Sequence, residues 1–287
     1  MLESLVLACG AASDGIRTRP GSGQASSGGG PVYPRSPHQL RTTVEALLAG
    51  ARIAPVTAPK AIIVPHAGYL YSGAVAGTAF AALQPYAGTI KRVVLIGPAH
   101  YVLFRGLAVP TVDAFETPLG IVPLVRDAAT ALADLAPVVR ADAPHAPEHA
   151  LEVELPFLQI VLRSFELVPL LAGDAAPEEV AGALDRLWGG PETLIVVSSD
   201  LSHFHDYETA RHLDAVTAAQ IERGQGASLR PGVACGYLAV AGLLIELTRR
   251  GLGEQRLSLA NSGDTTGTQD RVVGYGAWIT DAAQSTP

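Results

Sequence analysis

Four apolar runs in this chain lack the alternation of polar and apolar residues that marks a half-exposed strand. They are KAIIVP (60–65), KRVVLIGP (91–98), FELVPLLAG (165–173) and ETLIVVSSD (192–200). Strands of this kind are buried on both faces, as happens when helices cover both sides of a parallel sheet. The runs therefore predict an α/β protein with a largely parallel central sheet.

Segments with helical spacing separate these runs. Helices are predicted over residues 38–50, 73–84, 148–164, 177–188, 206–224 and 234–251, and Pro156 marks a kink or restart in the third of them. A closing pair of strands is predicted over 257–264 and 271–279, with Asn261–Asp264 as a turn. Strands that alternate with helices indicate one α/β domain, predicted over residues 32–282. Residues 1–31 are rich in Gly and Ser and are predicted to be a disordered leader.

Composition excludes several classes of partner. The 287-residue chain has a formal net charge of −7 and no cluster of Lys or Arg, which argues against nucleic acid or an anionic membrane as a partner. The longest nearly apolar run, residues 233–245, is too short to span a bilayer. Cys9 and Cys235 form no disulfide framework, so we expect a cytoplasmic protein.

Three of the buried strands end at an imidazole or a carboxylate side chain. His66 follows the first and His100 follows the second, while Asp200 ends the run over 192–200 and His203 follows it. Ligands of open α/β sheets bind outside the carboxyl ends of the strands. The sequence therefore predicts that these side chains meet at one edge of the sheet.

Imidazole is the commonest metal ligand in proteins, and His66 and His100 are the best pair for a metal site. A third ligand must come from elsewhere. Cys235, near the start of an apolar helix, is one candidate, although a free cysteine also commonly packs in a core.

Other polar residues leave two interpretations open. Glu148, His149 and Glu152 are either an acidic first helical turn or a group that orients the metal ligands. The remaining histidines are predicted to lie at the surface; they are His38, His145, His205 and His212.

Six blocks of this sequence resemble the MEMO family, whose bacterial and archaeal members are called AmmeMemoRadiSam system protein B. They are PHAGYLYSG (65–73), GPAH (97–100), EHALEVELPFL (148–158), SSDLSHFHDYE (198–208), ACGYLAV (234–240) and NSGDTTGTQDRVVGYGAW (261–278). The family is similar in fold to the class III extradiol dioxygenases, whose iron is held by two histidines and a glutamate. The resemblance therefore implies the same α/β fold.

The resemblance also implies roles for individual residues. His66, His100 and Cys235 fall on the family's metal ligands, and Asp200 and His203 line the same cleft, with His203 as an acid/base oriented by Asp200. His149 and Glu152 match a further family block, and Tyr69 is expected beside the site. Tyr101 stands where many members have a second histidine. The implied metal is iron(II), with copper or zinc as alternatives, because a His/His/Cys set is not selective by itself.

Two functions of different classes follow from the resemblance. The first is a metal-dependent, dioxygenase-like oxidoreductase acting on a small molecule or peptide in the cleft. The second is a non-catalytic metal-binding or interaction module that works with AMMECR1-domain and radical SAM proteins, which the family name associates with it. Metal-assisted hydrolysis is a third option.

Overall fold

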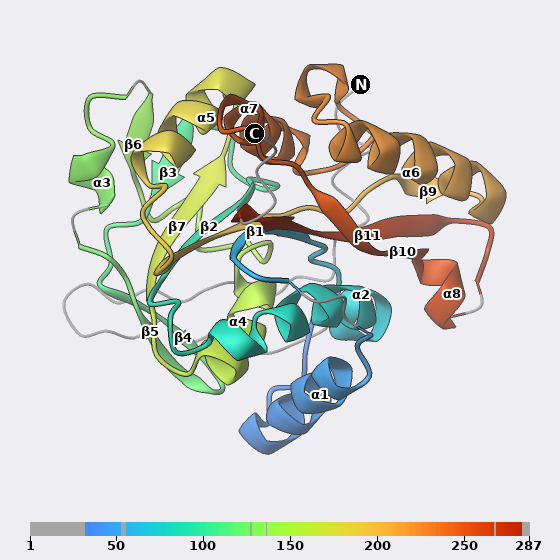
Figure 1. Ribbon diagram of the computed structural model, residues 1–287. Coiled ribbons are helices and arrows are strands. Elements are labelled where there is room, and N and C mark those ends of the chain that lie inside the picture. The colour runs from blue at the N-terminus through green and yellow to red at the C-terminus, as the bar shows by residue number, and fades with distance from the viewer. Residues whose placement is uncertain (1–31, 53–55, 127, 136, 267, 283–287) are drawn as a thin grey trace.

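The computed structural model describes residues 32–52, 56–126, 128–135, 137–266 and 268–282. The predicted leader, residues 1–31, and Cys9 within it lie outside these ranges. Nine of the described strands form one mixed sheet, in the order β10-β11-β1-β8-β2-β7-β3-β6, with β9 paired to β11. The predicted α/β fold is confirmed (Figure 1).

The strands of this sheet and of a separate hairpin have the following bounds: β1 (Pro59–Val64), β2 (Arg92–Pro98), β3 (Leu107–Val109), β4 (Ala114–Thr117), β5 (Gly120–Pro123), β6 (Val138–Arg140), β7 (Glu166–Ala172), β8 (Thr193–Ser198), β9 (His203–His205), β10 (Gln255–Asn261) and β11 (Val272–Asp281). The α-helices are α1 (Pro37–Ala49), α2 (Tyr69–Ala82), α3 (Ala128–Ala131), α4 (Leu155–Leu162), α5 (Pro177–Arg186), α6 (Tyr207–Glu222), α7 (Tyr237–Arg249) and α8 (Ser262–Thr266). Short 3₁₀ turns cover η1 (Gln84–Tyr86), η2 (Glu152–Glu154) and η3 (Gly226–Ser228).

The centre of the sheet consists of the four apolar runs that the sequence marks as buried. Strands β1, β8, β2 and β7 are parallel neighbours, whereas β11 pairs antiparallel with both β1 and β10. Every residue of β1 and β8 is buried. Parallel pairing places the carboxyl ends of the four central strands at the same edge of the sheet.

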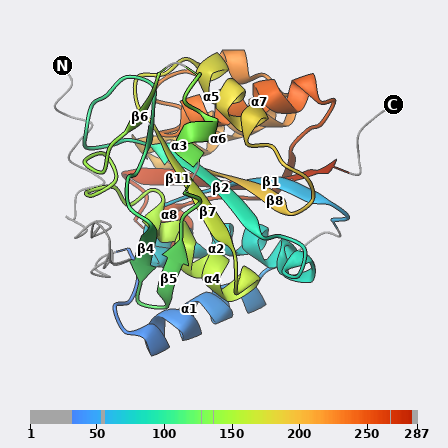
Figure 2. The same ribbon diagram turned by 90° about the vertical axis from the view of Figure 1, so that its left-hand side faces the viewer.

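Helices cover both faces of the sheet. Figures 1 and 2 show α1, α2 and α4 on one face and α5, α6 and α7 on the other. Two apolar clusters correspond to these layers: Phe80 of α2 and Phe157 of α4 pack in one, and Leu184 of α5 and Leu244 of α7 pack in the other. In the described part of the chain, no helix combines the length and the apolar character needed to cross a membrane.

Several predicted boundaries are wrong near the carboxyl edge. Helix α2 begins at Tyr69 rather than at residue 73, with Gly68 as its N-cap. Residues 148–151 are not helical, and the chain becomes helical in the 3₁₀ turn η2 before α4 starts at Leu155. Helix α7 begins at Tyr237, so Cys235 precedes it. Residues 262–266 form the short helix α8 where a turn was predicted.

A buried acid next to β10 predicts an unusual pH dependence of stability. The Oε1 atom of Glu254 accepts a hydrogen bond of 2.8 Å from Thr280, and its Oε2 has no partner among the described residues. Burial raises the pKa of Glu254 to about 8. Because only the folded state keeps this proton above the ordinary pKa of ~4.3, stability falls by about 1.4 kcal/mol per pH unit as pH rises toward the folded pKa.

We therefore expect Glu254→Gln to gain stability over the wild type progressively between pH 5 and pH 8, on the order of 1.4 kcal/mol per unit. Urea unfolding of both proteins across this range measures the difference. A difference that stays constant with pH would contradict the assignment of a neutral Glu254.

Candidate metal centre

Three adjacent parallel strands deliver the first part of the site. His66 lies two residues after the end of β1, Asp200 two residues after the end of β8, and His100 two residues after the end of β2. Because β8 lies between β1 and β2, the three turns meet at the carboxyl edge of the sheet. Cys235 approaches from the loop before α7.

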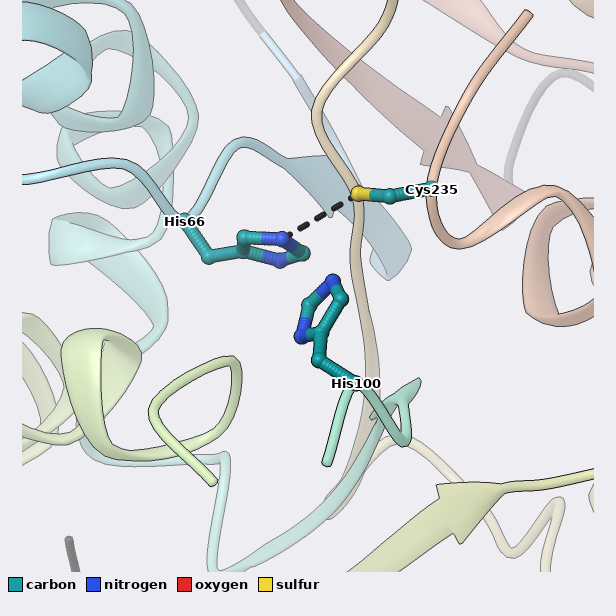
Figure 3. Close-up of side chains that lie close together, drawn as sticks. All are labelled: His66, His100 and Cys235. Atoms are coloured by element: carbon teal, nitrogen blue, oxygen red, sulfur yellow. Dashed lines mark hydrogen bonds between the residues drawn. The ribbon is translucent and has the colours of Figure 1, made fainter. Parts of the chain in front are cut away.

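The side chains of His66, His100 and Cys235 converge, as Figure 3 shows. Their candidate ligand atoms all lie within 4.8 Å of one another. The Sγ atom of Cys235 is 3.2 Å from Nε2 of His66, and the two imidazole centroids are 5.3 Å apart. Two donors bound to one tetrahedral ion lie about 3.4–3.6 Å apart, so modest adjustment would let these three atoms share a metal.

His100 is oriented by Glu148. The Nδ1 atom of His100 lies 2.9 Å from Oε1 of Glu148, and the main-chain N–H of His100 donates to Oε2 at 2.7 Å. Burial lowers the pKa of His100, but the hydrogen bond and the charge of Glu148 outweigh it and the net pKa is raised. The Nε2 atom of His100 is buried with no hydrogen-bond partner among the described residues. A buried, unpartnered imidazole nitrogen beside a thiol fits a metal ligand.

The main chain of Asp200 holds Cys235 in place. The Asp200 N–H donates to Sγ of Cys235 at 3.2 Å, and the Cys235 N–H donates to the Asp200 carbonyl at 3.2 Å. Gly236 allows this approach, because a Cβ there would lie 2.7 Å from the carbonyl oxygen of Ser198. The glycine of the ACGY block is therefore required by the contact between this loop and the end of β8.

The carboxylate of Asp200 organises the turn that carries His66. Its Oδ1 accepts the main-chain N–H of His66 at 2.8 Å. Burial raises the pKa of Asp200 to about 7, against the opposing effects of the His66 and Ala67 main-chain hydrogen bonds and of His100. The predicted orientation of His203 by Asp200 is wrong, since Nδ1 of His203 lies 2.8 Å from the main-chain oxygen of Leu201 instead.

His203 lies on a strained segment. The next residue, Phe204, has φ of 63°, in the left-handed region that a bulky side chain rarely adopts. The guanidinium of Arg271 lies over the Phe204 ring at 5.0 Å, and His203 pairs with Val273 of β11. Burial lowers the pKa of His203, which favours its neutral form. Strain of this kind persists where surrounding contacts fix the backbone.

The residues expected beside the ligands have different positions. His149 is buried, and its ring stacks on His100 at 5.5 Å and meets His66 edge-on at 5.7 Å. Tyr69 donates a hydrogen bond of 2.7 Å to the Val153 carbonyl, and Glu152 accepts one of 2.6 Å from Tyr33. Tyr69 and Glu152 therefore hold the segment behind the site in place.

Two further outcomes concern residues outside the predicted ligand set. His145 was predicted to lie at the surface but is fully buried, with its ring 6.2 Å from Phe115, and burial lowers its pKa to about 4. Ser198 and Glu154 were assigned no role, yet Ser198 contacts Nδ1 of His66 and Glu154 contacts Ser198. The signal for Ser198 was a hydroxyl at the last position of a buried strand, after four apolar residues.

The fold and the site define an α/β protein with a His/His/Cys cluster, able to hold a metal ion, at the carboxyl edge of parallel strands. The family model of the Memo-like protein matches residues 25–279, and the chain belongs to this family. It is 33% identical to a MEMO1 family protein of Thermotoga petrophila over 86% of this chain and 95% of that one. A MEMO1 family protein of Methanopyrus kandleri is also 33% identical, over 87% of this chain and 96% of the relative.

A solved structure supports the fold independently. The crystal structure of an uncharacterized protein from Escherichia coli K12 superposes with a TM-score of 0.50 and covers 75% of this chain and 98% of that one. At 13% sequence identity, this similarity shows a shared fold alone.

Proposed function

We propose that this protein binds a divalent metal ion, iron(II), through Nε2 of His66, Nε2 of His100 and Sγ of Cys235. The observation that carries the proposal is the convergence of these atoms within 4.8 Å. Nδ1 of His66 lies 2.7 Å from Ser198 and Nδ1 of His100 lies 2.9 Å from Glu148, which leaves each Nε2 directed at the site. Fixing the far nitrogen in this way is how proteins orient metal-binding imidazoles.

Three protein ligands leave coordination positions open, which favours a catalytic over a structural metal. Bound iron(II) would supply Lewis acidity and redox capacity, in keeping with a dioxygenase-like oxidoreductase acting on a small molecule. His203 would move the proton: its Nδ1 is engaged by Leu201, so Nε2 is the free basic nitrogen, and burial keeps the ring neutral.

Metal analysis of protein purified without oxygen tests the metal assignment. We expect near-stoichiometric iron in the wild type and little in His66→Ala. If the purified protein contains zinc or copper instead of iron, the proposed metal site stands and the assignment of iron is overturned. If the protein contains only trace metal, even after reconstitution with iron(II), the proposed metal site is overturned.

A second experiment separates the acid/base role from ligation. We expect His203→Ala to keep the wild-type metal content and to lower oxygen uptake with a responsive substrate by about 10²-fold or more. His205→Ala, two residues away and exposed, is the matched control and should leave both values unchanged. Loss of metal in His203→Ala would make His203 a ligand, and unaltered uptake would remove it from the mechanism.

A further inference from the structure

A buried hydrogen-bond chain runs from His66 away from the metal ligands. The hydroxyl oxygen of Ser198 lies 2.7 Å from Nδ1 of His66, 2.7 Å from the carbonyl oxygen of Ala150, and 3.2 Å from Oε1 of Glu154. His66, Ser198 and Glu154 are all 0% exposed. Because bulk solvent does not reach these residues, the hydrogen bonds of the chain are counted among the groups named here.

Counting hydrogens fixes the direction of each bond. Ser198 has one hydroxyl hydrogen, and the Ala150 carbonyl can only accept, so this hydrogen points to Ala150. Nδ1 of His66 must then be an N–H that donates to Ser198, which leaves the lone pair of the ring on Nε2. The remaining lone pair of Ser198 faces Glu154, which must therefore be a neutral acid that donates its O–H.

We propose that Ser198 and Glu154 are positioning residues of the metal centre that lock His66 in the Nδ1–H tautomer. This inference rests on the proposed metal site, and it adds a second support that mirrors the action of Glu148 on His100. With Nδ1 protonated, Nε2 faces the Cys235 thiol at 3.2 Å as an acceptor and is available to a metal. The bonds of Ser198 are then complete, one donated and two accepted.

The surroundings of Glu154 agree with this arrangement. Burial raises its pKa well above the ordinary range, and the nearby charge of Asp200 acts in the same direction. Its Oε2 atom is buried without a hydrogen-bond partner among the described residues, where a full negative charge would be poorly solvated. Glu152, in the same 3₁₀ turn, bonds Tyr33 instead and has no part in the chain.

The tautomer of His66 can be measured directly. Long-range ¹⁵N–¹H NMR of metal-free protein distinguishes a protonated Nδ1 from a protonated Nε2, and the chain predicts Nδ1–H in the wild type and loss of that preference in Ser198→Ala. A wild-type His66 protonated at Nε2 would overturn the proposal whether or not the protein binds metal. This readout therefore stays informative if the metal site itself fails.

Zinc(II), which undergoes no redox change, is the probe for the effect on affinity. We expect Ser198→Ala to weaken zinc binding about 10- to 100-fold in a chelator competition. Glu154→Gln keeps a donor toward Ser198 and should stay within about twofold of the wild type, whereas Glu154→Met removes it and should lose about tenfold. Glu246→Gln is the control, because Glu246 is also buried but pairs with Arg249 and Arg250 on α7, and it should leave zinc affinity unchanged.

Two outcomes would overturn the chain. Wild-type affinity in Ser198→Ala would show that Ser198 does not position His66. Equal affinities of Glu154→Gln and Glu154→Met would show that Glu154 donates nothing to Ser198. If Ser198→Ala does not fold, the wild-type tautomer and the two Glu154 variants still decide the question.

Discussion

Cys235→Ala is expected to abolish metal binding while the fold survives. The change removes the sulfur that lies 3.2 Å from Nε2 of His66 and leaves two imidazoles as the only proposed protein ligands. Because a full ligand set is worth about 10–16 kcal/mol, one ligand contributes several kcal/mol, so we expect affinity to fall by roughly a thousand-fold or more. Cys235 is partly exposed, so its truncation should cost only about 1 kcal/mol of folding stability.

Metal stoichiometry of the folded variant under reducing conditions is the measurement. Cys9→Ala removes the other thiol of the chain and serves as the control. Wild-type iron occupancy in Cys235→Ala would mean that the cysteine only packs, and that the ligand set is wrong.

Cys235→Glu sharpens the same test. A carboxylate in place of the thiolate gives two histidines and one acid, a set that suits iron(II) with open positions. We expect this variant to retain some iron and to lose affinity for soft metals such as copper(I). Undiminished copper(I) binding would show that the sulfur does not determine which metal binds.

The sequence was sufficient to predict the parts of the fold that burial controls. Strands β1, β2, β7 and β8 are apolar and buried except for polar residues near their ends, and a sheet covered on both faces accommodates them. The meeting of His66 and His100 followed from that geometry, because parallel strands of one sheet end at the same edge. Local pattern and global fold agree at these positions, which makes prediction reliable there.

The supporting hydrogen bonds could not be predicted in the same way. Glu148 reaches His100 across 48 residues of sequence, and Ser198 reaches Ala150 across another 48. No periodicity encodes such contacts, since they depend on how residues 148–154 pack against the ends of β2 and β8. The orienting partner of His203 was wrong for the same reason: a main-chain carbonyl, that of Leu201, replaces the expected carboxylate, and main-chain groups leave no mark in a sequence.

Glu148→Gln tests the support of the second imidazole and is expected to damage stability and metal affinity together. Glu148 is buried and accepts four N–H groups, from Nδ1 of His100 and from the main chains of His100, His149 and Ala150. Glutamine has a single acceptor oxygen, and its amide NH₂ would face an N–H donor. We expect a loss of about 3 kcal/mol in the free energy of unfolding and a 10- to 100-fold loss in zinc affinity.

The pKa of Glu148 predicts how the stability difference between the wild type and Glu148→Gln changes with pH. Burial raises the pKa of Glu148, but the hydrogen bond and charge of His100 lower it more, and the net pKa lies below the ordinary value. A carboxyl group with a lowered folded-state pKa contributes stability above its unfolded pKa of ~4.3 and loses that contribution as pH falls through the folded value. The stability difference between wild type and Glu148→Gln should therefore shrink in acid.

Glu246→Gln is the matched control, because Glu246 is equally buried but pairs with Arg249 and Arg250 on α7. Glu246→Gln should lower the stability and leave zinc affinity at the wild-type value. A fall in zinc affinity in Glu148→Gln can then not be attributed to weakened folding. Competition titrations at pH 7 and urea unfolding between pH 3.5 and pH 7 measure both quantities. Wild-type zinc affinity in Glu148→Gln would show that His100 presents Nε2 without Glu148. The idea that a hydrogen bond to Nδ1 orients each metal-binding imidazole would then be wrong for His100.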